Sequence, residues 1–301
     1  MRMLALGAAL FLGQSILAEP PLREAGYARL GPIVPTFDRG YVFQPLESPR
    51  AAVMVQKPDG AVLFTTHVEV PGTTGVSVWN GAADSDGVLA VGAAYRTEGD
   101  RHGGGIAYFD HTGKQARFVD TSPYVPTHLS FGTDHSLWTL GYVWGWNRKA
   151  AGDYRIVRRY SAEGKETGAF LPRSVFPPGL EPGMGPLGSW SLRVVHDRVG
   201  ALLVYGDISK NKEWVELDLN GDLLGRWKVG EYRGLAFTDS AHLYRYLWKG
   251  HEAGLEMFDR DAGKFREIEF TPPANAALLG AEGDDLVYQA ADRLIWVRAP
   301  Q

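Results

Sequence analysis

The sequence contains no cysteine, and this absence excludes several chemistries at once. A disulfide, a thiolate metal site, a cysteine nucleophile and a lipid-modified N-terminal cysteine all require a thiol. A surplus of positive charge is also missing, because 31 Lys and Arg residues face 35 Asp and Glu residues. A protein that binds nucleic acid needs excess cations to meet the phosphates, so we expect no nucleic-acid partner.

Long apolar runs are absent except at the N-terminus. There, a positively charged start is followed by apolar residues 4–12 and by a cleavage site after Ala18. This order predicts an export signal over residues 1–18, although Ile16 stands where a small residue is preferred; the alternative is an ordinary buried helix. The run is too short to span a bilayer as a helix. We therefore expect a periplasmic or secreted protein that has no transmembrane anchor after signal cleavage.

Known catalytic motifs and helical periodicity are also missing. The sequence has no G-x-S-x-G elbow, no P-loop and no H-E-x-x-H pair. With 18 Pro, 37 Gly and frequent β-branched runs, no long segment keeps a period of 3.6 residues. What remains is a chain of short apolar strands separated by tight turns, which is typical of an all-β protein.

One hairpin pattern recurs along the chain: an apolar strand, a turn that ends in glycine, and a second strand. The glycines that end these turns are Gly60, Gly113, Gly164, Gly221 and Gly263. Their spacing of roughly fifty residues is in the range of one four-stranded propeller blade. A second kind of turn, rich in Asp, Asn and Gly, recurs between the hairpins at residues 84–87, 132–135, 196–200, 238–240 and 282–285. These residue types tolerate the backbone angles of tight turns.

The two recurring turns predict a single β-propeller over residues 19–301, with six blades of four antiparallel strands, named A to D from the inside outwards. A five-bladed ring is the main alternative, and a sandwich is disfavoured because it need not repeat one hairpin at a near-constant period. The inner strands of the first blade must come from residues 35–48. The last blade lacks an outer strand, which residues 25–43 could supply, so that strands from both chain ends close the ring.

The third repeat carries a resemblance to a known family. It contains Pro126 before an apolar strand, an acidic turn at Asp134, and the apolar-aromatic pair Leu137-Trp138. This run resembles the six-bladed propellers of the NHL and TolB-like kind, closely in this repeat and only as a period over the rest of the chain. The resemblance implies a fold. That superfamily includes lactonases, lyases, peptide binders and scaffolds, so no single function follows.

A propeller has two unlike faces. The A–B and C–D turns lie on one face, here called the turn face, and the B–C and D–A connections lie on the other, the loop face. The irregular segments 96–105, 145–153, 170–188 and 248–254 fall on the loop face. Because loops on a rigid scaffold usually carry binding, we expect the ligand there, near the central channel. The candidate ligand-binding residues are Arg96, His102, Tyr124, His128, Trp144, Trp146, Arg148, Trp190, Arg193, Trp248 and His251.

Aromatic faces beside Arg and Asn suit sugars or peptides, although any single Trp could instead pack between blades. The histidines expected on the loop face, His102, His128 and His251, lack metal-ligand spacing along the chain. The Asp84–Gly87 turn mimics part of a calcium loop, but similar turns recur in most blades. No metal and no cofactor are therefore predicted, and no catalytic residue is assigned.

Two functions remain open. The first is a monomeric, non-catalytic binding or scaffold module with a glycan or protein partner. The second is a metal-dependent or His/acid-dependent lyase, lactonase or glycosidase with its site at the mouth of the central channel. An enzyme should place ionisable residues from several blades within reach of one another at the channel.

Overall fold

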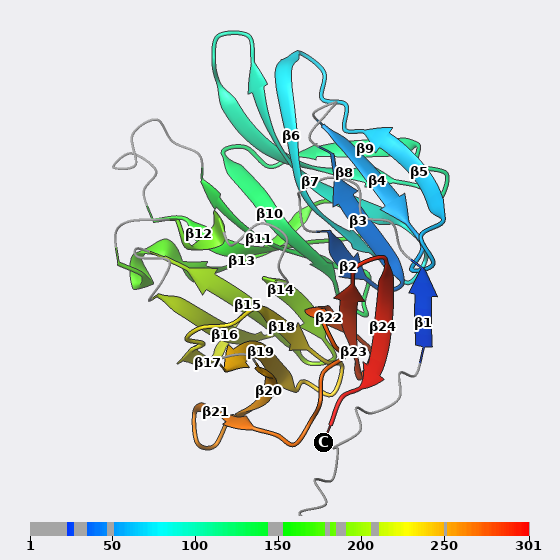
Figure 1. The fold of residues 1–301 in the computed structure, drawn as a ribbon. Helices are drawn as coiled ribbons and strands as arrows, with labels where there is room; N and C mark the ends of the chain where they lie inside the picture. Colours follow the sequence, from blue (N-terminus) through cyan, green and yellow to red (C-terminus); the bar gives the residue numbers. More distant parts are fainter. Residues whose placement is uncertain are drawn as a thin grey trace, which may run out of the picture.

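The computed structural model describes residues 23–26, 35–46, 51–143, 153–177, 181–184, 191–205, 211–249 and 252–300. Within these ranges the chain forms strands and turns, with two single 3₁₀ turns at Arg173–Val175 and Pro182–Met184. The strands form six separate four-stranded antiparallel sheets arranged as the blades of a ring (Figure 1). The six-bladed, all-β prediction is confirmed, and the five-bladed alternative is wrong.

The first three blades follow the chain in simple order, from the inner strand to the outer strand. Blade 1 consists of β2 (Thr36–Asp38), β3 (Tyr41–Pro45), β4 (Ala52–Gln56) and β5 (Val62–His67). Blade 2 consists of β6 (Thr73–Ala83), β7 (Leu89–Thr97), β8 (His102–Phe109) and β9 (Gln115–Asp120). Blade 3 consists of β10 (Tyr124–Phe131), β11 (Leu137–Val143), β12 (Arg155–Tyr160) and β13 (Glu166–Pro172).

The next two blades repeat this order, and the last blade departs from it. Blade 4 consists of β14 (Leu192–Val195), β15 (Arg198–Val204), β16 (Lys212–Asp218) and β17 (Leu223–Lys228). Blade 5 consists of β18 (Gly234–Phe237), β19 (Leu243–Lys249), β20 (Glu252–Asp259) and β21 (Lys264–Glu267). Blade 6 consists of β22 (Ala277–Glu282), β23 (Asp285–Ala290), β24 (Arg293–Arg298) and, as its outer strand, β1 (Arg23–Gly26).

The two ends of the chain meet in blade 6. Strand β1 pairs antiparallel with β24, and the Arg23 side chain donates a hydrogen bond to Glu282 Oε2 at 2.6 Å. The same guanidinium lies 3.7 Å above the ring of Trp296, whose indole N–H also donates to Glu282. The outer strand of blade 6 begins at Arg23, just before the segment 25–43 that was predicted to supply it. Residues 36–45, within the predicted range 35–48, form the inner strands of blade 1.

The recurring glycine turns are the C–D turns of the blades, as predicted. In blade 2, Gly113 has φ +83°, in the left-handed region that favours glycine. The Asp110 carboxylate accepts hydrogen bonds from the backbone N–H groups of Thr112 and Lys114, and so closes the same turn. Gly60, Gly164 and Gly221 have closely similar φ values, which shows that one local solution is repeated around the ring.

The core lies between neighbouring blades. The ring of Trp214 in blade 4 meets Phe237 of blade 5 at 5.1 Å, and Phe37 of blade 1 meets Trp296 of blade 6 at 5.9 Å. These tryptophans pack between blades, as the alternative interpretation of each single Trp expected. Blades 2 and 3 approach each other closely at Gly104 of β8, where an added Cβ would stand 2.1 Å from the carbonyl oxygen of Tyr124.

Two segments predicted as irregular loops are extended hairpins. The expected loop 96–105 consists of the ends of β7 and β8, joined by a tight turn at residues 98–101. The expected loop 248–254 likewise consists of the ends of β19 and β20. Cross-strand pairing therefore continues past the ring, and in Figure 1 the hairpin of β7 and β8 projects beyond the other blades. In the described part of the chain, no helix is long and apolar enough to cross a membrane.

Candidate functional site

Charged side chains from several blades gather at the mouth of the channel on the turn face. Arg193 of β14 donates to Asp239 Oδ1 in the A–B turn of blade 5 and to the carbonyl oxygen of Ala281 in blade 6, each at 3.0 Å. On the other side of the mouth, Arg39 of blade 1 donates to the carbonyl oxygen of Phe131 in blade 3 at 2.8 Å. Both guanidinium groups thus join blades that are not neighbours in sequence.

Asp38 completes this group. Its carboxylate accepts a hydrogen bond from the Ala83 backbone N–H at 2.9 Å. Burial raises the pKa of Asp38, and the nearby Arg193 and Arg39 only partly oppose that rise. The cavity that these residues line holds about 90 Å³. Ligand pockets usually measure about 300–1,000 Å³, so this mouth has room for a few water molecules and not for a sugar-sized substrate.

One group on the turn face has the composition of a divalent-cation site. Asp84 and Asp86 of blade 2 and His135 of blade 3 each offer a ligand atom, and these atoms lie within 4.8 Å of one another. His135 Nδ1 lies 2.8 Å from Asp84 Oδ2, and this hydrogen bond raises the pKa of His135. Arg39 lies 3.6 Å from the other oxygen of Asp84. Asp84 is thus already in contact with an imidazole and a guanidinium.

The loop face is hollowed instead by open clefts. One cleft of about 820 Å³ lies over blade 2 and is called here the blade-2 cleft. It is lined by Ala51, Thr73, Thr74, Gly75, Val76, Ser77, Trp79, Ala94, Tyr95, Arg96, His102 and Tyr142. Most of these residues belong to the extended ends of β6, β7 and β8, so the projecting strands form its walls.

The polar groups of the blade-2 cleft stand beside an aromatic floor. Arg96 and His102 are cross-strand partners, so their side chains lie on the same side of the hairpin. The indole nitrogen of Trp79 is buried and has no hydrogen-bond partner. The Tyr95 hydroxyl lies 2.8 Å from both Asp120 and Ser122, and burial raises its pKa. Burial also raises the pKa of Tyr142 to about 12, so both phenols stay protonated at neutral pH.

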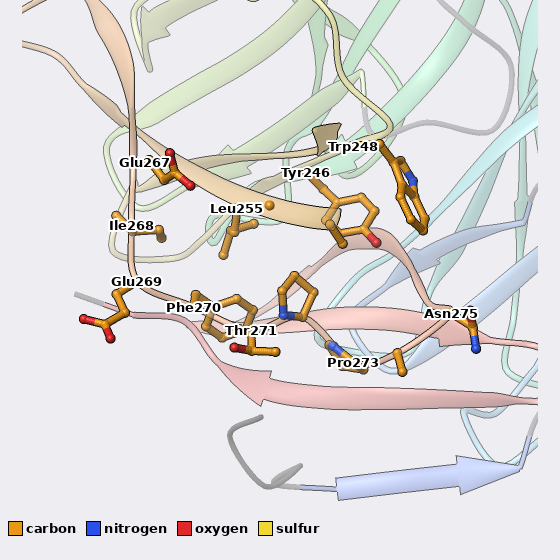
Figure 2. A pocket seen from close by; sticks show the side chains of 14 residues that line it. Tyr246, Trp248, Leu255, Glu267, Ile268, Glu269, Phe270, Thr271, Pro273 and Asn275 are labelled. Carbon is orange, nitrogen blue, oxygen red and sulfur yellow. The ribbon is translucent and has the colours of Figure 1, made fainter. Parts of the chain in front are cut away.

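A second cleft on the loop face lies between blades 5 and 6 and is called here the Trp248 groove. It has a volume of about 570 Å³, and Figure 2 shows the aromatic rings of Tyr246 and Trp248 along its edge. Its lining residues are Tyr246, Trp248, Ala253, Gly254, Leu255 and residues 267–275. The Trp248 side chain is 47% exposed, which is unusual for so large an apolar group. An adjoining cleft of about 540 Å³ shares both aromatic residues and also contains Arg233 and Gln289.

The structure brings only some of the predicted site residues together. Arg96 and His102 share the blade-2 cleft, whereas Trp248 lies in a separate groove. Arg193 belongs to β14 and lies at the turn face, not on the loop face where we had expected it, because the inner strand carries its side chain into the channel. The predicted residues Trp144, Trp146, Arg148, Trp190 and His251 lie outside the described residues.

Two further predicted residues lie inside strand β10 instead of on an exposed crossing. Tyr124 is fully buried, and its hydroxyl donates to the carbonyl oxygen of Ile156 at 2.9 Å. His128 is also buried, with Nδ1 3.0 Å from the hydroxyl of Thr127. Both had been expected to flank the D–A crossing that leads into blade 3. Their observed contacts are those of blade packing.

Sequence reasoning missed Trp79 and Tyr142. Trp79 closely follows residues 73–77, all of which line the blade-2 cleft. The alternation of Val76 and Val78 with small residues was visible in the sequence, but nothing local showed that β6 would run past the ring. Tyr142 looks like a core residue of β11, and only the neighbouring blade makes it part of the cleft.

Comparisons with known proteins support the fold alone. No protein-family model matches this sequence, and no curated protein matches it. A luciferin-regenerating enzyme is similar in structure, with a TM-score of 0.50, 10% identity, and coverage of 93% of this chain and 96% of that one. A gluconolactonase from Xanthomonas campestris is also similar in structure, with a TM-score of 0.47 and 14% identity. That match covers 93% of this chain and 99% of the other.

The β-propeller domain of the Trilobed protease from Pyrococcus furiosus is a third similar structure. Its TM-score is 0.46 and its identity 7%; the match covers 72% of this chain and spans 63% of that domain's length. At such identities the likeness says nothing about the reaction or ligand. The resemblance to NHL and TolB-like propellers, which no family model supports, stays a prediction.

Proposed function

We propose that this protein is a non-catalytic binding propeller that holds a saccharide in the blade-2 cleft. The observation that carries the proposal is an open cleft whose lining combines three aromatic side chains with a cation and an imidazole, namely Trp79, Tyr95, Tyr142, Arg96 and His102. The cleft volume of about 820 Å³ also falls within the usual range for ligand sites.

The chemistry of the lining supports a saccharide as the ligand. A sugar ring has apolar C–H faces and a rim of hydroxyl groups, and an indole ring supplies a matching flat surface. Around Trp79 the hydroxyl of Ser77, the guanidinium of Arg96 and the imidazole of His102 can bind such a rim. The lining therefore pairs a stacking surface with several donors and acceptors.

The contacts of the charged residues argue against the enzymatic alternative. The ionisable residues that converge from several blades lie at the turn face, where hydrogen bonds occupy Arg193, Arg39 and Asp38 and the cavity is small. In the blade-2 cleft, His102 lies 3.6 Å from Asp100, but this carboxylate is about half exposed. Catalytic acids and bases are tuned by burial, and the Asp100 carboxylate is not buried.

Export is part of the proposal and rests on the N-terminal sequence alone. If residues 1–18 act as a signal, the full-length chain expressed in a Gram-negative host should appear in the periplasm with an intact mass that begins at Glu19. Retention of residues 1–18 in a cytoplasmic product would contradict this part of the proposal.

The binding proposal can be tested with an oligosaccharide array followed by calorimetric titration of the best hit. Trp79→Ala removes the indole surface, and Arg96→Ala removes an exposed cation. Each should weaken binding by roughly tenfold, since an aromatic contact and a hydrogen bond are each worth about 0.5–1.5 kcal/mol, and a hydrogen bond to a charged group more. Arg266→Ala, an exposed arginine on the outer strand of blade 5, is the matched control and should bind as the wild type does.

Two results would contradict the saccharide proposal. One is an array that shows no binding above background with the folded wild-type protein. The other is saccharide binding that survives both cleft variants unchanged.

A further inference from the structure

The Trp248 groove contains a strand edge that no other strand covers. Strand β20 is eight residues long, whereas its outer neighbour β21 has only four. Their pairing stops at Glu256 and Glu267, and one more hydrogen bond follows, from the Ile268 N–H to the Leu255 carbonyl oxygen at 3.3 Å. Beyond that point the chain leaves the sheet and forms the opposite wall of the groove (Figure 2).

Strand geometry shows which backbone groups are exposed at this edge. In a strand, the N–H and C=O of alternate residues point to the same neighbour. Because the Leu255 carbonyl faces β21, the backbone N–H and C=O of Ala253 face that side too, into the groove. On the opposite side of β20, Ala253 is the register partner of Trp248 in β19. No strand in the described part of the chain pairs with Ala253 on the groove side.

Among the side chains that the structure describes, this edge lacks the features that usually protect an exposed strand. Proteins commonly block such edges with charged side chains, proline or a bulge. Here the two positions at the edge are Ala253 and Gly254, whose side chains are too small to cover the backbone. The facing wall contains Pro272 and Pro273, which have no N–H and cannot take up the free carbonyl.

Charge and apolar surface indicate what the groove would accept. The acidic side chains of Glu267 and Glu269 line it, and no basic side chain does among its described residues. At the same edge the Trp248 ring offers a large exposed apolar surface. A chain that brings its own backbone donors, an apolar side chain and a cation would complement all three features.

We propose that the Trp248 groove binds an extended basic peptide segment by adding it as a strand to the free edge of β20. This recognition mode takes its affinity from main-chain hydrogen bonds and its selectivity from alternate side chains. One side chain of the segment would pack on Trp248, and a Lys or Arg would lie near Glu269. The site is independent of the blade-2 cleft, so either proposal can fail without the other.

A displayed library of random octapeptides tests this directly on the folded full chain. We expect enrichment of sequences with a basic residue next to an apolar one. Each selected peptide is then synthesised twice, once unmodified and once with every second backbone amide N-methylated, and is titrated by fluorescence anisotropy. N-methylation removes main-chain donors but keeps the side chains, so it should lower affinity at least tenfold.

Variants of the protein complete the experiment. Ala253→Pro deletes the free N–H and blocks the edge, and Glu269→Lys reverses the charge; each should lower peptide affinity at least tenfold. Leu223→Ala, which removes an exposed apolar side chain from blade 4, should leave it unchanged. A circular dichroism melt of each variant checks folding, and Glu269→Lys, at an exposed position, keeps the test usable if Ala253→Pro is unstable.

Three outcomes would overturn the inference. They are no enrichment from the library, equal affinity for the N-methylated and unmodified peptides, and binding that Glu269→Lys leaves unchanged. A Trp248-dependent affinity for oligosaccharides, with no affinity for peptides, would also overturn it and would assign the groove to sugars.

Discussion

On the turn face, short turns exchange hydrogen bonds between blades, whereas on the loop face the strands run past the ring and enclose clefts. Arg193 and Arg39 tie distant blades together across the channel mouth on the turn face. On the loop face, Trp79 lines the blade-2 cleft and the Trp248 side chain is 47% exposed. The difference teaches that, among the described residues, charged groups at the channel mouth join blades, whereas aromatic side chains line the clefts of the loop face.

The ion cluster around Glu216 should give the largest effect on stability. This fully buried carboxylate accepts hydrogen bonds from Arg198, Arg260 of the next blade, and the indole N–H of Trp214. Glu216→Ala removes the buried carboxylate that the two arginines share, and Arg198 keeps only the exposed Asp197 as an acidic partner. Removing one member of a buried pair costs about 3–5 kcal/mol of unfolding free energy, which urea denaturation measures.

The loop face supplies the control for that experiment. Glu269→Ala, at an exposed position of the Trp248 groove, should change the unfolding free energy by less than about 0.5 kcal/mol. Equal losses from the two substitutions would break the contrast between the faces.

Two glycines of blade 2 compare the closely packed ring with the open cleft. Gly104→Ala would push a methyl group into the backbone of Tyr124, and overpacking of this kind costs about 1–3 kcal/mol. Gly75→Ala lies on the cleft wall, where an added Cβ would meet nothing within 4 Å, and should be close to neutral. Thermal melts compare the two variants. A Gly104 variant as stable as the Gly75 variant would show that β8 and β10 can separate.

Asp38 tests how much the burial of a carboxylate at the channel mouth costs the folded state. Burial raises its pKa, so the folded state holds this proton more tightly than the unfolded state does. The buried carboxyl therefore destabilises the folded state least at low pH, where it is protonated. The free energy of unfolding falls as pH rises through the folded pKa of Asp38. We expect Asp38→Asn to raise the melting temperature at pH 7 and to lose that advantage near pH 3, below the ordinary carboxyl pKa of about 3.9. A variant that melts lower at pH 7 would show that Asp38 is held as a needed anion.

His135 should give the smallest effect. Its hydrogen bond to Asp84 raises its pKa, so the folded state favours the imidazolium. The contact stabilises the fold fully below the unfolded pKa of about 6.5 and is lost as pH rises through the higher folded value. His135→Gln should therefore flatten the slope of melting temperature against pH above about 6. Unchanged slopes in wild type and variant would show that this exposed pair contributes nothing to blade contact.

Much of the fold could be predicted because propeller turns are local. The glycine of a C–D turn and the side chain that caps it lie within a few residues of each other, as at Asp110 and Gly113, so the chain itself specifies the turn. Five copies of this turn at a near-constant spacing, followed by one more strand, then predict the six-bladed ring. The placement of Arg96, His102 and Trp248 in connections of the loop face also followed from this local order.

The candidate site could be predicted only in part, because clefts depend on how far strands extend and on which blade lies beside them. The sequence does not show that β7 and β8 continue pairing to Thr97 and His102, which converts an expected loop into a wall. It also does not show that Tyr124 faces a neighbouring strand, so that a residue predicted to bind a ligand is buried in the core.

The sequence by itself determined the strand pattern, the turn chemistry and the number of repeats, since each depends on residues close together along the chain. Only the tertiary structure decided which side chains share a cleft, which charges meet across the channel, and that β20 keeps an uncovered edge at Ala253. The physical reason is that these features arise from blades far apart in sequence, whose relative placement depends on close packing around the whole ring.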